Sequence, residues 1–199
     1  MKPLHYLVLL YILGIGEILS PKATYGQIHT KDFNIFLRKF KILALPVEIK
    51  PLPNPPKELS VTAAKSIDTE FIGTNAGYWV CYGVLPDTSN YFHLIWLVPT
   101  ELYIPILTTF TKTGRMISQQ DLSIGDCASG PCGYVCEVSA LIKKDYTIYL
   151  SDTITINKCD DNGGVIPGTA SSKVLYRIGK KVQNGTIEFE KQSEKDLKK

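Results

Sequence analysis

The sequence of 199 residues contains little histidine, little excess charge and no long apolar run. Of its three histidines, only His29 and His93 follow the first 26 residues. A serine or cysteine hydrolase needs a base beside its nucleophile, so this scarcity argues against that class. The net charge of +3 is too small to indicate nucleic-acid binding. No segment has the roughly 20 apolar residues of a membrane-spanning helix, so we expect no permanent membrane span.

Motifs for hydrolase and metal chemistry are also missing. The chain has no Gly-x-Ser-x-Gly elbow and no metal-binding motif that pairs His with Glu. The loop Asp160–Gly164 is rich in oxygen ligands, but Ser171 stands where an EF-hand loop would carry its bidentate Glu. A zinc site built from the four clustered cysteines would depart from the usual two-residue spacing. We therefore expect no metal and no cofactor.

The first 26 residues have the pattern of an export signal peptide. Lys2 supplies a positive charge, Leu7–Leu13 is apolar, and Thr24-Tyr25-Gly26 precedes Gln27 as a cleavage signal. Such an ending resembles the leaders of Gram-negative exported proteins, and this resemblance covers the leader alone. The competing interpretation is an ordinary buried N-terminal helix. We expect an exported protein, in the periplasm, on the outer envelope surface or secreted.

The cysteines predict disulfides in such a protein. Cys127, Cys132 and Cys136 lie close together in a glycine-rich segment, and Cys159 follows them. Outside the cytosol, a cluster of this kind is typical of disulfide bonding. Four cysteines allow three pairings. We favour a local Cys127–Cys132 or Cys127–Cys136 bond, with Cys159 taking the remaining partner. The fifth, Cys81, lies within an apolar segment, where an inert buried thiol is the expectation.

Four regions follow from the patterning. Residues 1–26 form the leader, 27–70 a helical and proline-rich segment, 71–190 a β domain, and 191–199 a charged tail expected to fray. Phenylalanines spaced as on one face of a helix predict a helix over 31–41, and 60–70 is a second, shorter one. Between them, five prolines from Pro46 to Pro56 exclude a helix or a central strand.

From residue 71 onward the hydrophobic pattern has a period of two. Tight turns such as Lys112–Arg115 and Asn184-Gly185 separate the apolar segments. The first two strands are apolar on both faces, so we expect both faces to be covered. The sequence predicts a mainly β fold, an antiparallel sheet, sandwich or partly open barrel with one or two short N-terminal helices. The expected strands are 78–85, 91–98, 104–111, 116–124, 134–142, 146–150, 153–158, 173–180 and 186–190, with a loop over 159–172.

The leading functional hypothesis is an exported bacterial protein that acts as a non-enzymatic binding or structural domain of the cell envelope. Tyr78, Tyr82, Tyr91 and Trp96 are candidate binding residues, because aromatic rings on an exposed sheet face stack on sugars or on a partner's sheet. The partner would be another envelope protein or a glycan. The competing interpretation is that two adjacent apolar strands bury these rings.

Two other classes remain open. A small secreted hydrolase would use Cys81 with His93, or carboxylates such as Glu101, Asp121 and Glu137 brought together across strands. An inhibitor or immunity-type protein would present a long unpaired edge strand or a rigid loop around residues 127–136.

Overall fold

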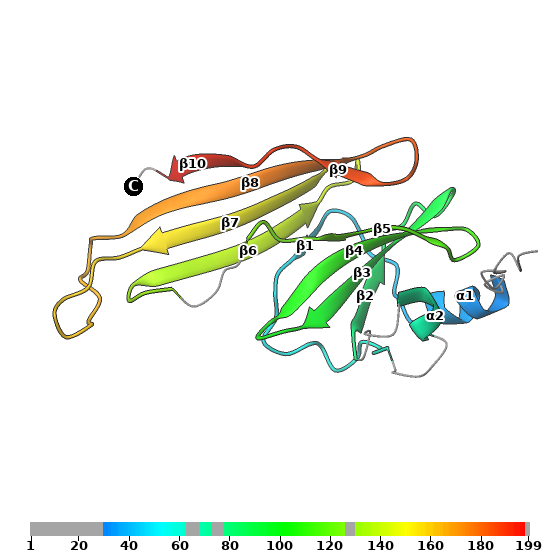
Figure 1. Cartoon of the computed structure of the whole chain (residues 1–199), viewed down its shortest axis with the longest axis horizontal. Coiled ribbons are helices and arrows are strands. Elements are labelled where there is room, and N and C mark those ends of the chain that lie inside the picture. The colour runs from blue at the N-terminus through cyan, green and yellow to red at the C-terminus, as the bar shows by residue number, and fades with distance from the viewer. Residues whose placement is uncertain (1–29, 63–67, 73–77, 126–129, 198–199) are drawn as a thin grey trace, which may run out of the picture.

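The computed structural model describes residues 30–62, 68–72, 78–125 and 130–197 (Figure 1). These residues form two antiparallel sheets and two short helices, which confirms the expected mainly β, sandwich-like class. The expected leader, residues 1–26, lies outside the described residues. No helix within the described ranges has the length and apolar character needed to cross a bilayer.

The first sheet, called sheet A, is a meander of four strands within the described residues. Its spatial order is the same as its chain order, and every neighbouring pair is antiparallel. The turn between the last two strands contains Gly114 at a φ of 86°, the left-handed conformation that glycine adopts without strain. The strands are β2 (Val80–Val84), β3 (Tyr91–Pro99), β4 (Tyr103–Thr111) and β5 (Met116–Asp121).

The second sheet, called sheet B, contains six strands within the described residues. Five of them follow one another in the order β1-β6-β7-β8-β10, and β9 also pairs with β8. Each neighbouring pair is antiparallel. The strands are β1 (Val47–Ile49), β6 (Tyr134–Ile142), β7 (Ile148–Ile156), β8 (Ser171–Lys181), β9 (Ile187–Phe189) and β10 (Ser193–Leu197).

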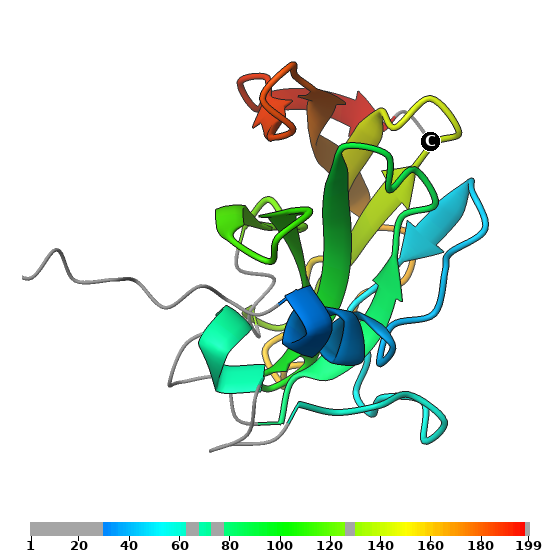
Figure 2. The same ribbon diagram turned by 90° about the vertical axis from the view of Figure 1, so that its right-hand side faces the viewer.

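An aromatic cluster covers one face of sheet A. The helices α1 (Thr30–Leu37) and α2 (Asp68–Ile72) lie against this face (Figure 2). Phe36 of α1 contacts Trp96 of β3 with ring centroids 5.5 Å apart, and Phe71 of α2 lies 4.7 Å from Phe36. The phenylalanine spacing that predicted the helix is therefore explained by core packing.

The other face of sheet A packs against sheet B. Alternate residues of the two sheets meet there, because successive side chains of a strand point to opposite faces. Burying each aliphatic side chain of this kind contributes about 1.5–3 kcal/mol. The contributing residues include Ile95, Leu97 and Leu107 of sheet A and Ala140, Ile142, Ile148 and Leu150 of sheet B. Sheet A is thus covered on both faces, as its apolar strands predicted.

Sheet B is longer than the layer that covers it. In Figure 1, β6, β7 and β8 continue past the end of sheet A toward the β7–β8 loop. Along β7, burial declines from Ile148 and Leu150, which are buried, to Ile156, which is exposed. The face of sheet B turned toward sheet A is called the inner face below, and the opposite one the outer face.

Several boundaries differ from the sequence-based expectation. Residues 146–150 and 153–158 were expected to form two strands, but β7 is continuous from Ile148 to Ile156. Asp152, in its middle, is buried, and its carboxylate accepts a hydrogen bond from the Gly125 N–H at 3.0 Å. The carboxylate is thus accommodated within the strand. The proline-rich segment contributes β1 at a sheet edge. The charged tail forms β10, which the backbone ladder to β8 and a 3.2 Å Lys173–Glu194 ion pair hold in place.

Candidate functional site on the outer face of sheet B

The outer face of sheet B carries polar and aromatic side chains. In β7, Ile148, Leu150 and Asp152 point inward and are buried. The alternating residues, which point outward, are half-buried: Tyr149, Ser151, Thr153 and Thr155. The same alternation in β6 directs Val138, Ala140 and Ile142 inward, so that Ser139 and Leu141 point outward. The same strands therefore have one face buried in the core and one face turned to solvent.

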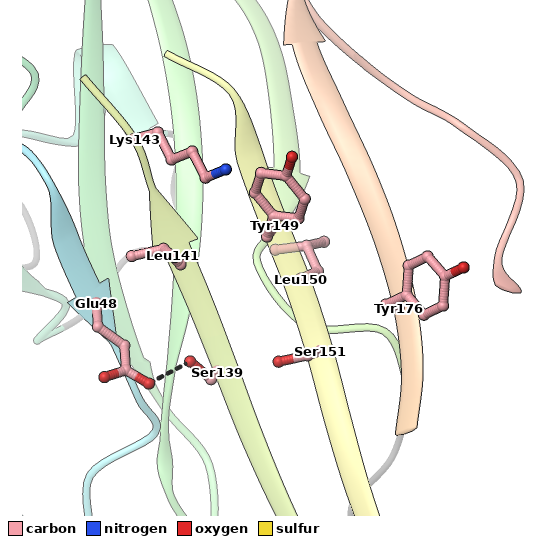
Figure 3. A pocket seen from close by; sticks show the side chains of 8 residues that line it. All are labelled: Glu48, Ser139, Leu141, Lys143, Tyr149, Leu150, Ser151 and Tyr176. Carbon is pink, nitrogen blue, oxygen red and sulfur yellow. Dashed lines mark hydrogen bonds between the residues drawn. The ribbon is translucent and has the colours of Figure 1, made fainter. Parts of the chain in front are cut away.

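An open depression of about 510 Å³ lies on this outer face (Figure 3). Strands β1, β6, β7 and β8 all contribute to its lining. Its lining residues are Glu48, Ser139, Leu141, Lys143, Tyr149, Leu150, Ser151 and Tyr176. Glu48 and Lys143 line it with opposite charges and Lys50 lies beside Glu48, so the depression has no row of charges of one sign that would select for a strong anion or a strong cation.

Glu48 supplies a fixed acceptor at one side of the depression. The Ser139 hydroxyl donates a hydrogen bond to Glu48 Oε1 at 2.7 Å, and Lys50 Nζ lies 3.4 Å from the same oxygen. The hydrogen bond from Ser139 is the main cause that lowers the pKa of Glu48, followed by Lys50. Glu48 is therefore a carboxylate at neutral pH, held toward the sheet by Ser139 (Figure 3).

Two tyrosines form the aromatic part of the site. Tyr149 of β7 has Lys143 Nζ above its ring, 4.2 Å from the centroid. Tyr176 of β8 lies opposite Ser151, two register positions from the pair formed by Tyr149 and Ile178. The two rings thus stand on neighbouring strands at diagonal positions, a separation within reach of one extended ligand.

A row of hydroxyl groups crosses sheet B through the depression. Ser139 pairs with Ser151, Ser151 with Tyr176, and Tyr176 with Ser193. Directly paired residues share a face, so these four side chains project from the same face of adjacent strands. The strands themselves are about 4.7–4.9 Å apart. A hydroxyl both donates and accepts hydrogen bonds, so the row suits a ligand that carries hydroxyls of its own.

The four aromatic residues predicted from the sequence to bind a ligand do not lie together on one exposed face. Trp96 is 0% exposed and donates a hydrogen bond from Nε1 to Thr108 Oγ1, so it belongs to the core. Tyr82 is half-buried against the inter-sheet core. Gly185 packs so closely on Tyr91 that an added Cβ would lie 2.5 Å from the ring. Tyr78 is 70% exposed and lies just before β2, away from sheet B.

The structure does not bring Cys81 and His93 together. Cys81 is a buried thiol that pairs in register with Trp96 and shares the aromatic face of sheet A. His93 is an odd number of residues from Trp96 along β3 and so points to the opposite face, where its Nδ1 lies 3.1 Å from Thr109 Oγ1. Burial is the main cause that lowers the pKa of His93 to about 4. An imidazole held this way is neutral and structural.

The carboxylates singled out from the sequence also lie apart. Asp121 pairs with Ile106 in sheet A, Glu101 lies in the turn before β4, and Glu137 pairs with Thr153 in sheet B. Asp160 is occupied in a turn, since its Oδ1 accepts N–H bonds from Asn162 and Gly164. Among the described residues, no group of three or more His, Cys, Asp or Glu side chains is placed to hold a metal ion.

One disulfide is part of the described structure. Cys132 bonds to Cys159 and so ties the start of β6 to the loop between β7 and β8. Cys136 is also disulfide-bonded. Of the two favoured arrangements, the Cys132–Cys159 bond is compatible only with a Cys127–Cys136 bond. That second pair stays a prediction because Cys127 lies outside the described residues.

The depression itself was missed by the sequence reasoning. The sequence-based prediction placed the binding residues on the apolar strands of sheet A, whose aromatic residues are mostly in the core. The signal lay in β7, where Tyr149, Ser151, Thr153 and Thr155 alternate with Ile148, Leu150, Asp152 and Ile154. This alternation predicts that polar and aromatic side chains share one exposed face.

The comparisons with known proteins add no identity. No family model, no curated protein and no solved structure matches the chain.

Proposed function

We propose that this chain is an exported, non-enzymatic binding domain of the bacterial cell envelope, and that it binds its ligand on the outer face of sheet B. The observation that carries this proposal is the open depression, with its fixed carboxylate, its two tyrosines and its row of hydroxyls. Depressions that combine apolar rings with a few placed polar groups are typical of binding sites.

Export is supported by two independent features. The signal-peptide pattern of residues 1–26 directs the chain across a membrane. The Cys132–Cys159 disulfide and the disulfide-bonded state of Cys136 suit an oxidising compartment. An envelope location brings the protein into contact with both surface proteins and glycans.

A binding role is favoured over hydrolysis by the placement of the titratable groups. Cys81 and His93 point to opposite faces of sheet A, and both are buried. Glu48 is solvent-exposed and has its pKa lowered, the opposite of what a general acid needs. The depression therefore offers recognition groups and lacks an acid–base pair among the described residues.

The test is sedimentation of the purified protein with cell envelopes of the producing organism. Tyr149→Ala and Tyr176→Ala should each weaken binding severalfold, because each removes a ring from the depression. Tyr78→Ala is the matched control, since it removes an exposed ring next to β2 of sheet A, and it should bind as the wild type does. Equal binding by all four proteins would contradict the proposed function.

A further inference from the structure

We propose that the ligand of the outer-face depression is an uncharged polysaccharide chain that lies across strands β6, β7, β8 and β10 along the row Ser139–Ser151–Tyr176–Ser193. The inference rests on the proposed function, because it names the ligand class of the same site. It follows from the hydrogen-bonding chemistry of the row, from the charge of its surroundings and from the position of the two rings.

The hydroxyl row favours a ligand with hydroxyls. Ser139, Ser151, Tyr176 and Ser193 present one hydroxyl on each of four adjacent strands, and that of Ser139, which donates to Glu48, offers its acceptor capacity. If an apolar surface covered these groups, each one without a partner would cost free energy. A sugar chain carries hydroxyls on every ring, so it provides donors and acceptors at each strand that it crosses.

The charges favour a ligand without net charge. Glu48 and Lys143 line the depression with opposite signs, and Lys50 beside Glu48 adds one ammonium group, so the described lining has no row of charges of one sign. A nucleic acid or an anionic polymer would require a row of basic side chains. Glu48, held by Ser139, accepts hydrogen bonds as a carboxylate, and such bonds to sugar hydroxyls are stronger than neutral ones.

The tyrosines supply the apolar contact. A sugar ring has an apolar face of C–H groups that packs flat against an aromatic ring. Tyr176 belongs to the row itself, and Tyr149 stands diagonally beside it under the ammonium group of Lys143 (Figure 3). Stacking on Tyr176 places the sugar hydroxyls beside Ser151 and Ser193.

The experiment is calorimetric titration of the purified protein with cellohexaose, xylohexaose and mannohexaose. At least one should bind, and Tyr176→Ala should raise its Kd about tenfold. Tyr176→Phe keeps the ring and loses the hydroxyl, so its Kd should rise about threefold. Tyr78→Ala should leave the Kd unchanged. Failure of all three sugars to bind, or wild-type affinity of Tyr176→Ala, would overturn the inference.

Treated envelopes separate this inference from the proposed function. Periodate cleaves sugar rings that keep two neighbouring free hydroxyls, as the rings of these three sugars do, so it should abolish sedimentation of the protein with envelopes. If binding survives periodate and still depends on Tyr176, the polysaccharide inference is overturned while the proposed function stands. If Tyr176→Ala binds untreated envelopes as well as the wild type does, both are overturned.

Discussion

The two faces of sheet B are built from the same strands but differ in burial and in side-chain chemistry. On the inner face, Ile142, Ile148 and Leu150 pack against sheet A and are fully buried. On the outer face, Tyr149 and Ser151 alternate along β7 with the inner-face residues, Tyr176 is the partner of Ser151 in β8, and all three are partly exposed to solvent. Because successive side chains of a strand point to opposite faces, alternate residues of sheet B serve stability on one face and recognition on the other. Substitutions on the two faces should therefore have different effects on stability and on binding.

The largest expected effect is the loss of an inner-face side chain. Ile148→Ala should lower the free energy of unfolding by about 2–5 kcal/mol, because it removes buried methyl groups and leaves a cavity. The neighbouring substitution Tyr149→Ala should cost about 1 kcal/mol, since the half-buried ring loses its contact with Lys143 and no fully buried side chain is removed. Urea denaturation of both variants measures the difference. Equal losses would show that the two faces are not separate.

The second effect concerns the part of sheet B that sheet A does not cover. Replacing Cys132 and Cys159 by serine opens a link across 27 residues and should lower the free energy of unfolding by about 2–4 kcal/mol. Hydrogen exchange should quicken first in the loop 157–170. The control Asp161→Ala lies in the same loop and leaves the bond intact. Unchanged exchange in the double variant would show that the ladder alone holds this end.

A third effect arises from His93, on the side of sheet A that faces sheet B. Burial, with a further contribution from Lys181, lowers the pKa of His93, whereas Asp87 acts in the opposite direction. The unfolded state then binds a proton before the folded state does. Stability should therefore fall as the pH drops from 6.5 to about 4, by roughly 3 kcal/mol in total.

His93→Gln should flatten that dependence, because glutamine does not titrate in this range. Thermal unfolding between pH 7 and pH 4 measures it. The ion pair of Lys181 with Asp87, 3.0 Å apart, is retained in the variant, so its own contribution cancels in the comparison. An unchanged slope in His93→Gln would assign the pH dependence to other groups.

The smallest stability effect belongs to Glu48 on the outer face. Glu48→Gln keeps the size of the side chain and removes the charge that Ser139 and Lys50 contact. The unfolding midpoint should not change measurably, because the group is exposed to water. Envelope binding should weaken severalfold, since a neutral amide is the weaker acceptor. A large loss of stability without a loss of binding would reverse the assignment of this face.

Local patterns in the sequence were sufficient for much of the fold. The alternating segments predicted β6 at residues 134–142, and the phenylalanine spacing predicted α1. What local patterns do not contain is the pairing of distant segments. Ser193–Leu197 has no apolar side of its own, and it becomes β10 because β8 offers an open edge. Asp152 interrupts the apolar pattern, and its hydrogen-bond partner, the Gly125 N–H, lies 27 residues away in the chain, where no local pattern reveals it.

The candidate site was harder to predict for the same reason. Its row of hydroxyls exists only when β6, β7, β8 and β10 are placed in register. Ser139 and Ser193 are 54 residues apart in the chain and have no local feature in common. The aromatic residues of sheet A attracted attention because they are dense in sequence, yet density there reflects the packing of Trp96 and its neighbours in the core.

Hydroxyl-radical footprinting of the tyrosines, with and without envelopes, tests the central claim most directly. Oxidation reports the solvent exposure of each side chain, so a bound ligand protects the rings that it covers. The account predicts that envelopes protect Tyr149 and Tyr176 and leave Tyr78 as reactive as before. Protection of Tyr78 alone, or equal reactivity of Tyr149 and Tyr176 in both states, would contradict it.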